Sequence, residues 1–161
     1  MESMNNLRTE VKWALIWGAS LLIWMALERA FGLHGQYIEY HYSVTSIFLV
    51  VVVGIYVLEL FEKRRIAFEG RMTYKQGVFS ALILTLIITI LSPLLQVIIS
   101  EVITPNYFNN VINHVVEEGM MTEEEARKQF NLGNYLLQSA VGSALFGVVL
   151  SLILPAFLKK S

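Results

Sequence analysis

The stretch that decides the fold is residues 76–100, QGVFSALILTLIITILSPLLQVIIS, which contains no charged side chain. At about 1.5 Å per residue, a helix of this length spans roughly 37 Å, enough to cross a bilayer with some tilt. A basic stretch precedes it, and an acidic stretch, residues 101–125, follows it. Because Lys and Arg residues that flank a span stay in the cytoplasm, this asymmetry also predicts an orientation.

The composition extends this reading to the whole chain. Of the 161 residues, 55% are hydrophobic and 16% are charged, and the charges are concentrated in short intervals between long apolar runs. This distribution is typical of a membrane protein. The formal net charge of −1 gives no reason to expect a nucleic-acid partner. The chain contains no cysteine, which excludes disulfides and thiolate chemistry.

The apolar runs predict one all-α membrane domain, residues 1–161, in which four transmembrane helices form a bundle. The predicted spans are residues 11–31, 43–61, 76–100 and 135–158. Ser43 is expected to cap the second span, and Thr73 with Gln76 has the form of a capping box for the third.

Two further helix starts lie between the third and fourth spans. Thr104-Pro105 and the capping box formed by Thr122 and Glu125 predict two short helices, the first of which stops at Gly119. Residues 104–131 should therefore form an extracytoplasmic two-helix hairpin.

The basic residues predict the orientation. With both termini and residues 62–75 inside, nine of the twelve Lys and Arg residues are cytoplasmic, and only Arg29, Arg127 and Lys128 lie outside. We therefore expect a multi-pass protein of the bacterial inner membrane with both termini in the cytoplasm. The loop at residues 62–75 should face anionic lipid headgroups through five cations: Lys63, Arg64, Arg65, Arg71 and Lys75.

Two helix faces predict how the spans pack. Polar side chains share an arc of the third span, namely Thr85, Thr89, Ser92, Gln96 and Ser100, and Pro93 predicts a kink there. Small residues recur at every fourth position of the last span: Ser139, Ser143, Gly147 and Ser151. Such residues let two backbones approach closely, so we expect the two faces to meet. The alternative for the polar face is that it lines a permeation path.

Among the acidic residues, Glu28 is the candidate intramembrane acid. It shares a face of the first span with Ala14 and Gly18 and should point into the bundle, where it would be a proton or cation site. The alternative is an acid near the outer headgroups with Arg29 beside it. Glu59 lies four residues before Lys63, which predicts an ordinary exposed helix pair.

The three histidines have the residue type of zinc ligands, but their spacing matches no zinc motif. His34 and His41 lie with Glu39 in one outer loop, and His114 lies in the other. We therefore expect interface residues here, with no bound metal and no cofactor.

Short motifs spread over nearly the whole chain give it a family resemblance. They are Gly32-Leu33-His34, residues 72–77 (MTYKQG), Ser92-Pro93, residues 104–108 (TPNYF) and residues 121–126 (MTEEEA). With these motifs the chain resembles the small four-span bacterial membrane proteins, found mostly in Bacteroidota, that are catalogued only as a numbered domain of unknown function. The resemblance implies a helical inner-membrane protein, and it brings no catalytic or ligand residues.

The sequence contains no phosphate-binding loop, no dinucleotide fingerprint and no nucleophile elbow, so we expect no enzymatic activity. The function we expect is that of a non-enzymatic helper or scaffold in the lipid bilayer. Its outer hairpin would contact a membrane or periplasmic protein, and the chain could form a homo-oligomer. The alternative is a small oligomeric transporter or channel that uses the polar face of the third span.

Overall fold

The computed structural model describes residues 7–160. These residues form α2 (Arg8–Ala30), α3 (Ile38–Ala67), α4 (Tyr74–Ile98), a short π-helix η1 (Ile99–Ile103), α5 (Tyr107–Glu117), α6 (Glu123–Gln129) and α7 (Leu132–Leu158). Helices α2, α3, α4 with η1, and α7 are long and apolar enough to cross a membrane. The all-α membrane fold with four such helices is therefore confirmed.

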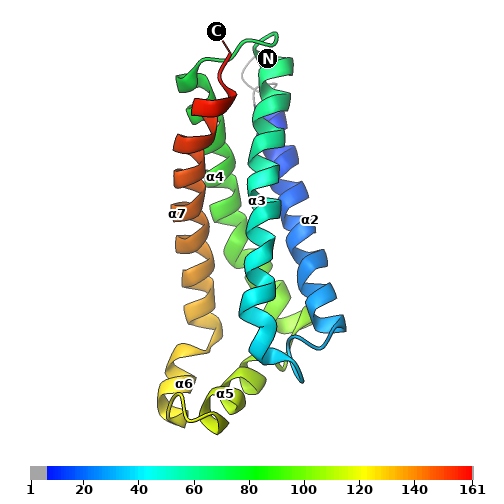
Figure 1. Cartoon of the computed structure of the whole chain (residues 1–161), viewed down its shortest axis with the longest axis vertical. Helices are drawn as coiled ribbons and strands as arrows, with labels where there is room; N and C mark the ends of the chain where they lie inside the picture. Colours follow the sequence, from blue (N-terminus) through cyan, green and yellow to red (C-terminus); the bar gives the residue numbers. More distant parts are fainter. Residues whose placement is uncertain (1–6, 161) are drawn as a thin grey trace.

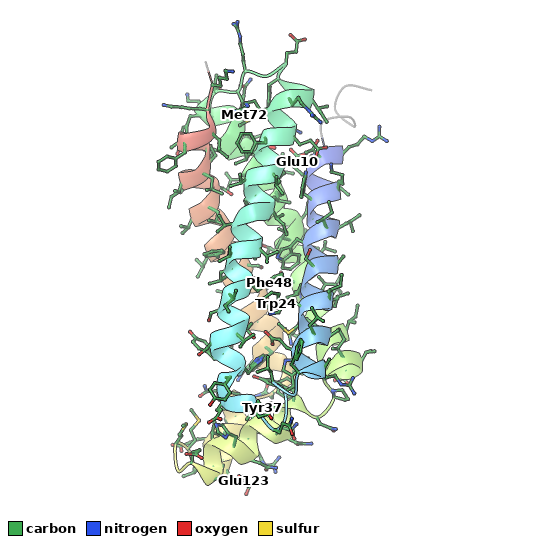
Figure 2. The ribbon with its side chains drawn as sticks, turned by 45° about the vertical axis from the view of Figure 1, so that its right-hand side comes forward. Glu10, Trp24, Tyr37, Phe48, Met72 and Glu123 are labelled. Carbon is green, nitrogen blue, oxygen red and sulfur yellow. The ribbon has the colours of Figure 1, made fainter. Side chains whose placement is uncertain are left out.

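The four long helices run side by side, with the start of α2 and the end of α7 at the same end of the bundle (Figure 1). The α3–α4 connection, residues 68–73, also lies there, and we call this end the basic end. Met72 in the connection and Lys160 after α7 exchange two backbone hydrogen bonds of 2.9 Å. Helices α5 and α6 lie at the opposite end, which we call the α5–α6 end; Figure 2 places Glu10 near the basic end and Tyr37 and Glu123 near the other.

Local signals set several of the helix boundaries. The capping boxes at Thr73 and Thr122 are both present and begin α4 and α6. Helix α5 ends at Glu117, and Gly119 follows with a φ of +66°, a conformation that side chains with a Cβ rarely adopt. These predictions are confirmed.

Other predicted boundaries are wrong. Helix α3 begins at Ile38, so Ser43 lies inside the helix and does not cap it, and α3 continues to Ala67 instead of ending near Phe61. Helix α5 begins at Tyr107. The Thr104 hydroxyl donates to the Ile99 carbonyl at 3.0 Å, so it closes η1 and does not cap α5. Apolar burial and contacts between helices outweighed these weak local signals.

The core lies where α2, α3 and α4 meet. Ala14, Tyr56, Leu60, Ala81 and Leu84 are at most 1% exposed. Near the middle of the bundle the rings of Trp24 and Phe48 pack with centroids 5.5 Å apart (Figure 2). The outer faces of these helices and of α7 expose large apolar side chains, among them Leu15, Ile23, Val50, Leu86 and Leu145. An apolar outer surface suits lipid rather than water.

Helices α4 and α7 pack against each other through small and polar side chains. A Cβ built on Gly147 would lie 2.5 Å from Thr85 Cγ2 and 2.6 Å from the Tyr56 hydroxyl. The Thr85 hydroxyl lies 2.8 Å from the Tyr56 hydroxyl and 3.0 Å from the Ser151 hydroxyl. The structure thus brings part of the polar face of α4 against part of the small-residue face of α7. Ser139 and Ser143 instead bond to backbone carbonyls of α7 and are half-buried.

Candidate functional site

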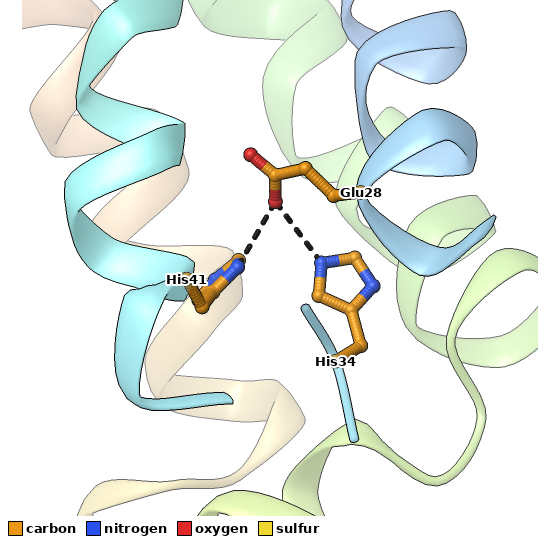
Figure 3. Close-up of side chains that lie close together, drawn as sticks. All are labelled: Glu28, His34 and His41. Carbon is orange, nitrogen blue, oxygen red and sulfur yellow. Dashed lines mark hydrogen bonds and ion pairs between the residues drawn. The ribbon is translucent and has the colours of Figure 1, made fainter. Parts of the chain in front are cut away.

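Three ionisable side chains meet inside the α5–α6 end of the bundle (Figure 3). Glu28 comes from the end of α2, His34 from the following turn and His41 from the start of α3. Glu28 Oε2 lies 3.1 Å from His34 Nε2 and 2.9 Å from His41 Nδ1. Glu28 is 2% exposed and His34 is 7% exposed, so the group is shielded from solvent. We call these three residues the Glu28 cluster.

The α2–α3 turn and the early start of α3 bring the cluster together. Gly32 adopts a φ of +78°, and its carbonyl accepts backbone hydrogen bonds from Gly35 and Tyr37. This tight turn folds His34 back under Glu28. Because α3 already begins at Ile38, His41 lies on the helix, one turn before Thr45, and both face Glu28.

Neighbouring side chains hold the carboxylate in one orientation. The indole Nε1 of Trp24, one turn before Glu28 on α2, donates to Oε1 at 2.6 Å. The Thr45 hydroxyl lies 2.8 Å from Oε1 and 2.9 Å from Oε2. Hydrogen bonds of this kind offset part of the cost of burying a carboxylate. With Oε1 bound by Trp24, Oε2 is the oxygen that faces both histidines.

Helix α5 covers the cluster. The Tyr107 ring lies 5.5 Å from the His34 ring and 5.1 Å from the His41 ring, measured between centroids. Its hydroxyl lies 3.2 Å from the Tyr135 hydroxyl at the start of α7, and Asn110 Nδ2 donates to the His34 carbonyl at 2.7 Å. Burial raises the pKa of Tyr107 above its usual range, so this hydroxyl keeps its proton.

Two cavities that are lined by His41 adjoin the cluster. One of about 170 Å³ is lined by His34, His41 and Thr45 together with Gln96 and Ser100 of α4 and η1. A second, wider cavity of about 570 Å³ between α3, α5 and α7 is also lined by His41. Space for small ligands therefore reaches the cluster at the α5–α6 end.

The polar face of α4 is divided between two environments. Its first half is packed: Thr85 is sealed against α3 and α7 as described above, and Ser92 bonds to the Ile88 carbonyl at 2.7 Å. The Thr89 hydroxyl is buried and has no hydrogen-bond partner among residues 7–160. Gln96 Nε2 donates to the Ser100 hydroxyl at 3.0 Å, and both residues line the smaller cavity. Thr85 and Ser92 are thus at most 5% exposed, whereas Gln96 and Ser100 border a cavity.

A second buried polar group lies at the basic end. Lys63 Nζ lies 2.7 Å from a carboxylate oxygen of Glu10, and the Ser80 hydroxyl lies 2.7 Å from carboxylate oxygens of both Glu10 and Glu59. Glu10 and Glu59 are fully buried and Lys63 is 3% exposed. The prediction of an exposed Glu59–Lys63 pair is therefore wrong, and Lys63 does not face lipid. Because α3 extends to Ala67, Lys63 turns inward to α2.

The remaining basic residues differ in their surroundings. Arg64 donates to the Leu158 carbonyl at 2.9 Å, which links α3 to the end of α7. Arg65, Arg71 and Lys75 are exposed at the basic end. The Arg29 guanidinium donates to the Ile103 carbonyl, and among the described residues the ion-pair partners of Glu28 are His34 and His41, not Arg29.

The other residues considered as metal ligands stay apart. Glu39 is exposed and His114 is half-buried on α5, and neither belongs to the Glu28 cluster. Sequence reasoning missed Trp24, Thr45 and Glu10. Helical spacing could have indicated each of them, because residues four apart lie on the same face of a helix. Trp24 lies four residues before Glu28, and Thr45 lies four residues after His41. Glu10 lies four residues before Ala14 on the buried face of α2.

Four helices of membrane length, apolar outside and with polar groups buried between them, define a multi-pass membrane protein. Residues 12–160 match the model of the family described as "Protein of unknown function (DUF4199)", and the chain belongs to that family. Comparison with curated proteins and with solved structures gave no match.

Proposed function

We propose that this protein is a non-enzymatic helper of the bacterial inner membrane that contacts a partner protein through the outer surface of α5 and α6, with both termini in the cytoplasm. The positive-inside rule supports this orientation, because the basic end carries exposed Arg65, Arg71 and Lys75. The start of α2 and the end of α7 lie at that same end (Figure 1).

The inner side of the α5–α6 unit supports a fixed platform. Val111, Ile112 and Val115 of α5 pack with Ala126 of α6, and Ile38, Tyr107, Met121 and Phe130 lie against them. Asn110 and Tyr107 tie α5 to the turn after α2 and to α7. The unit is therefore held to the bundle by both apolar and polar contacts.

The outer side supports a contact surface. Met120 is 65% exposed beside Glu117, Glu118 and Val116, which are also exposed. On α6 the acids are already paired, Glu123 with Arg127 at 2.8 Å and Glu124 with Lys128 at 2.6 Å. Glu117 and Glu118 form no ion pair within the described part of the chain.

The single observation that carries the proposal is this exposed turn, residues 116–120, on a unit anchored from its other side. Apolar side chains rimmed by unpaired acids are typical of a surface that binds a protein with a basic rim. The four spans would hold this surface at a fixed height above the membrane.

The absence of cysteine makes the orientation easy to test. Single variants Met120→Cys and Glu69→Cys place a thiol at the α5–α6 end and at the basic end. In spheroplasts, a membrane-impermeant maleimide should label the first and reach the second only after lysis. Labelling in the opposite order would overturn the orientation.

The contact is tested by a photo-crosslinking amino acid placed at Met120 in living cells, with the exposed Glu69 as the matched control position. We expect one discrete adduct from position 120 and none from position 69. The double variant Glu117→Lys, Glu118→Lys should remove the adduct without lowering the level of the protein. An adduct of twice the chain mass would identify the partner as a second copy, and no specific adduct would refute the helper function.

A second candidate function, transport by the polar face of α4, is favoured by one observation. The smaller cavity joins Gln96 and Ser100 to His34 and His41 inside the membrane-length part of the bundle. Proteoliposomes loaded with a pH-sensitive dye test this candidate. Proton flux that is lost in Gln96→Leu and in Glu28→Gln would support transport and overturn the helper function. Flux no greater than that of empty liposomes would exclude proton transport.

A further inference from the structure

We propose that the Glu28 cluster binds a divalent transition-metal ion of the zinc class, with Glu28 Oε2, His34 Nε2 and His41 Nδ1 as ligands. This site departs from the expectation of no metal drawn from sequence spacing, and it does not depend on the helper function. The ligands come from α2, the turn after it and α3 (Figure 3), so their separation in the sequence hides their proximity.

The spacing of the three ligand atoms suits a small tetrahedral ion. Zinc bonds nitrogen and carboxylate oxygen at about 2.0–2.2 Å, so two ligand atoms of one ion lie about 3.4 Å apart. Here Oε2 lies 3.1 Å from His34 Nε2 and 2.9 Å from His41 Nδ1, and all three atoms lie within 4.8 Å of one another. An ion would need only small movements of side chains that already converge.

The groups around the ligands form the outer shell that metal sites need. Trp24 Nε1 donates to Oε1, and Thr45 holds the same carboxylate, so the remaining oxygen points toward the imidazoles. Hydrogen bonds of this kind orient a carboxylate ligand and raise metal affinity. Asn110 fixes the backbone of His34 from α5.

The second ring nitrogen of His34 needs a partner of its own when Nε2 binds an ion. This atom, Nδ1, is buried and has no hydrogen-bond partner among the described residues. A buried polar atom without a partner is costly and needs a reason. With Nε2 bound to an ion, Nδ1 carries the ring proton, and the cavities lined by His34 give space for a water molecule that would accept it.

The ligand types select the class of ion. Two imidazoles and one carboxylate suit Zn²⁺ and neighbouring transition metals, whereas Mg²⁺ and Ca²⁺ prefer sites built from oxygen ligands. The adjoining cavity, lined by His34 and His41, leaves room on one side for a further small ligand such as water. Three protein ligands beside an accessible space are typical of a zinc site that is not closed.

The test is direct metal binding by the full chain, purified in detergent without a histidine tag and stripped with a chelator. Wild-type protein should bind one equivalent of Zn²⁺ in competition with a chromogenic chelator. Glu28→Gln, His34→Ala and His41→Ala should each weaken binding more than about tenfold. His114→Ala is the matched control, because it removes the chain's third histidine outside the cluster, and it should bind as wild type does.

Co²⁺ bound to the wild type gives a second readout that needs no variant. We expect visible absorption bands of the intensity typical of four-coordinate Co²⁺, and they should vanish when Zn²⁺ is added. Near-ultraviolet circular dichroism of each stripped variant checks that it has folded. Failure of the wild type to bind either ion would overturn the proposal. Binding that persists in the double variant His34→Ala, His41→Ala, or that is lost in His114→Ala, would overturn it equally.

Discussion

The substitution Gly147→Ala tests how closely α4 and α7 must approach. A Cβ at this position would lie 2.5 Å from Thr85 Cγ2, 2.6 Å from the Tyr56 hydroxyl and 2.7 Å from Thr85 Oγ1. Non-bonded carbon atoms prefer about 3.5–4.0 Å, so α7 would have to move away from α4 by about 1 Å. That shift would break the hydrogen bond between Thr85 of α4 and Ser151 of α7, while the Thr85–Tyr56 contact between α4 and α3 would remain.

The expected cost follows from these two effects. Overpacking costs about 1–3 kcal/mol. Each hydrogen bond between membrane helices contributes about 0.6 kcal/mol. Gly142→Ala is the matched control, because it lies on the same helix and a Cβ there would have no neighbour within 4 Å. Both variants replace glycine by alanine within a helix, so the gain in helix propensity cancels when the two are compared. Gly147→Ala should therefore lower the free energy of unfolding by about 2–4 kcal/mol relative to Gly142→Ala.

The assay is an equilibrium titration with SDS of protein in bicelles, followed by the fluorescence of the three tryptophans, Trp13, Trp17 and Trp24, all of which lie on α2. The Gly147→Ala midpoint should fall at lower SDS than that of Gly142→Ala. A difference between the two variants below about 0.5 kcal/mol would refute the reasoning, since it would mean that α7 can accept a methyl group where the structure leaves no space.

Two further predictions concern buried and capping charges. Lys63→Met should lower the free energy of unfolding by about 3–5 kcal/mol, because it leaves the buried carboxylate of Glu10 without the Lys63 cation. The double variant Lys63→Met, Glu10→Gln should recover most of this loss in the same SDS titration. No recovery in the double variant would refute the Glu10–Lys63 pairing. Hydrogen bonds from the Thr122 hydroxyl and backbone amide lower the pKa of Glu125 below its value of about 4.5 in the unfolded chain. The capping box should therefore stabilise α6 fully when the pH is above about 4.5, and it should weaken as the pH falls below that value. Amide exchange in α6, corrected for intrinsic rates, should therefore rise in acid for the wild type, and it should lose this pH dependence in Glu125→Gln.

Much of the fold follows from local sequence. A run of some twenty apolar residues partitions into lipid as a helix, because hydrocarbon leaves the backbone no other way to satisfy its hydrogen bonds. Capping boxes act within four residues, so Thr73 and Thr122 mark helix starts reliably. The inward face of the first span was equally predictable, and Glu28 lies on it with 2% of its surface exposed.

The candidate site depends on relations that the sequence does not display. The position of His41 depends on α3 starting at Ile38, which was missed because the weak signal at Ser43 suggested a later start. Lys63 was assigned to a lipid-facing loop because its partner, Glu10, lies 53 positions away. Such contacts depend on the relative rotation and height of two helices.

The sequence by itself thus determined that this chain forms four helices long and apolar enough to cross a membrane, and it predicted which faces turn inward. Both follow because a segment's partition into lipid depends on its own length and composition. Only the tertiary structure decided which buried polar groups meet, at the Glu28 cluster and at the Glu10–Lys63 pair. In lipid, an apolar side chain is solvated equally well by lipid tails and by a neighbouring helix, so the hydrophobic effect does not select which helices pack together. Close packing and hydrogen-bond geometry therefore choose the partners, and neither can be read from one helix alone.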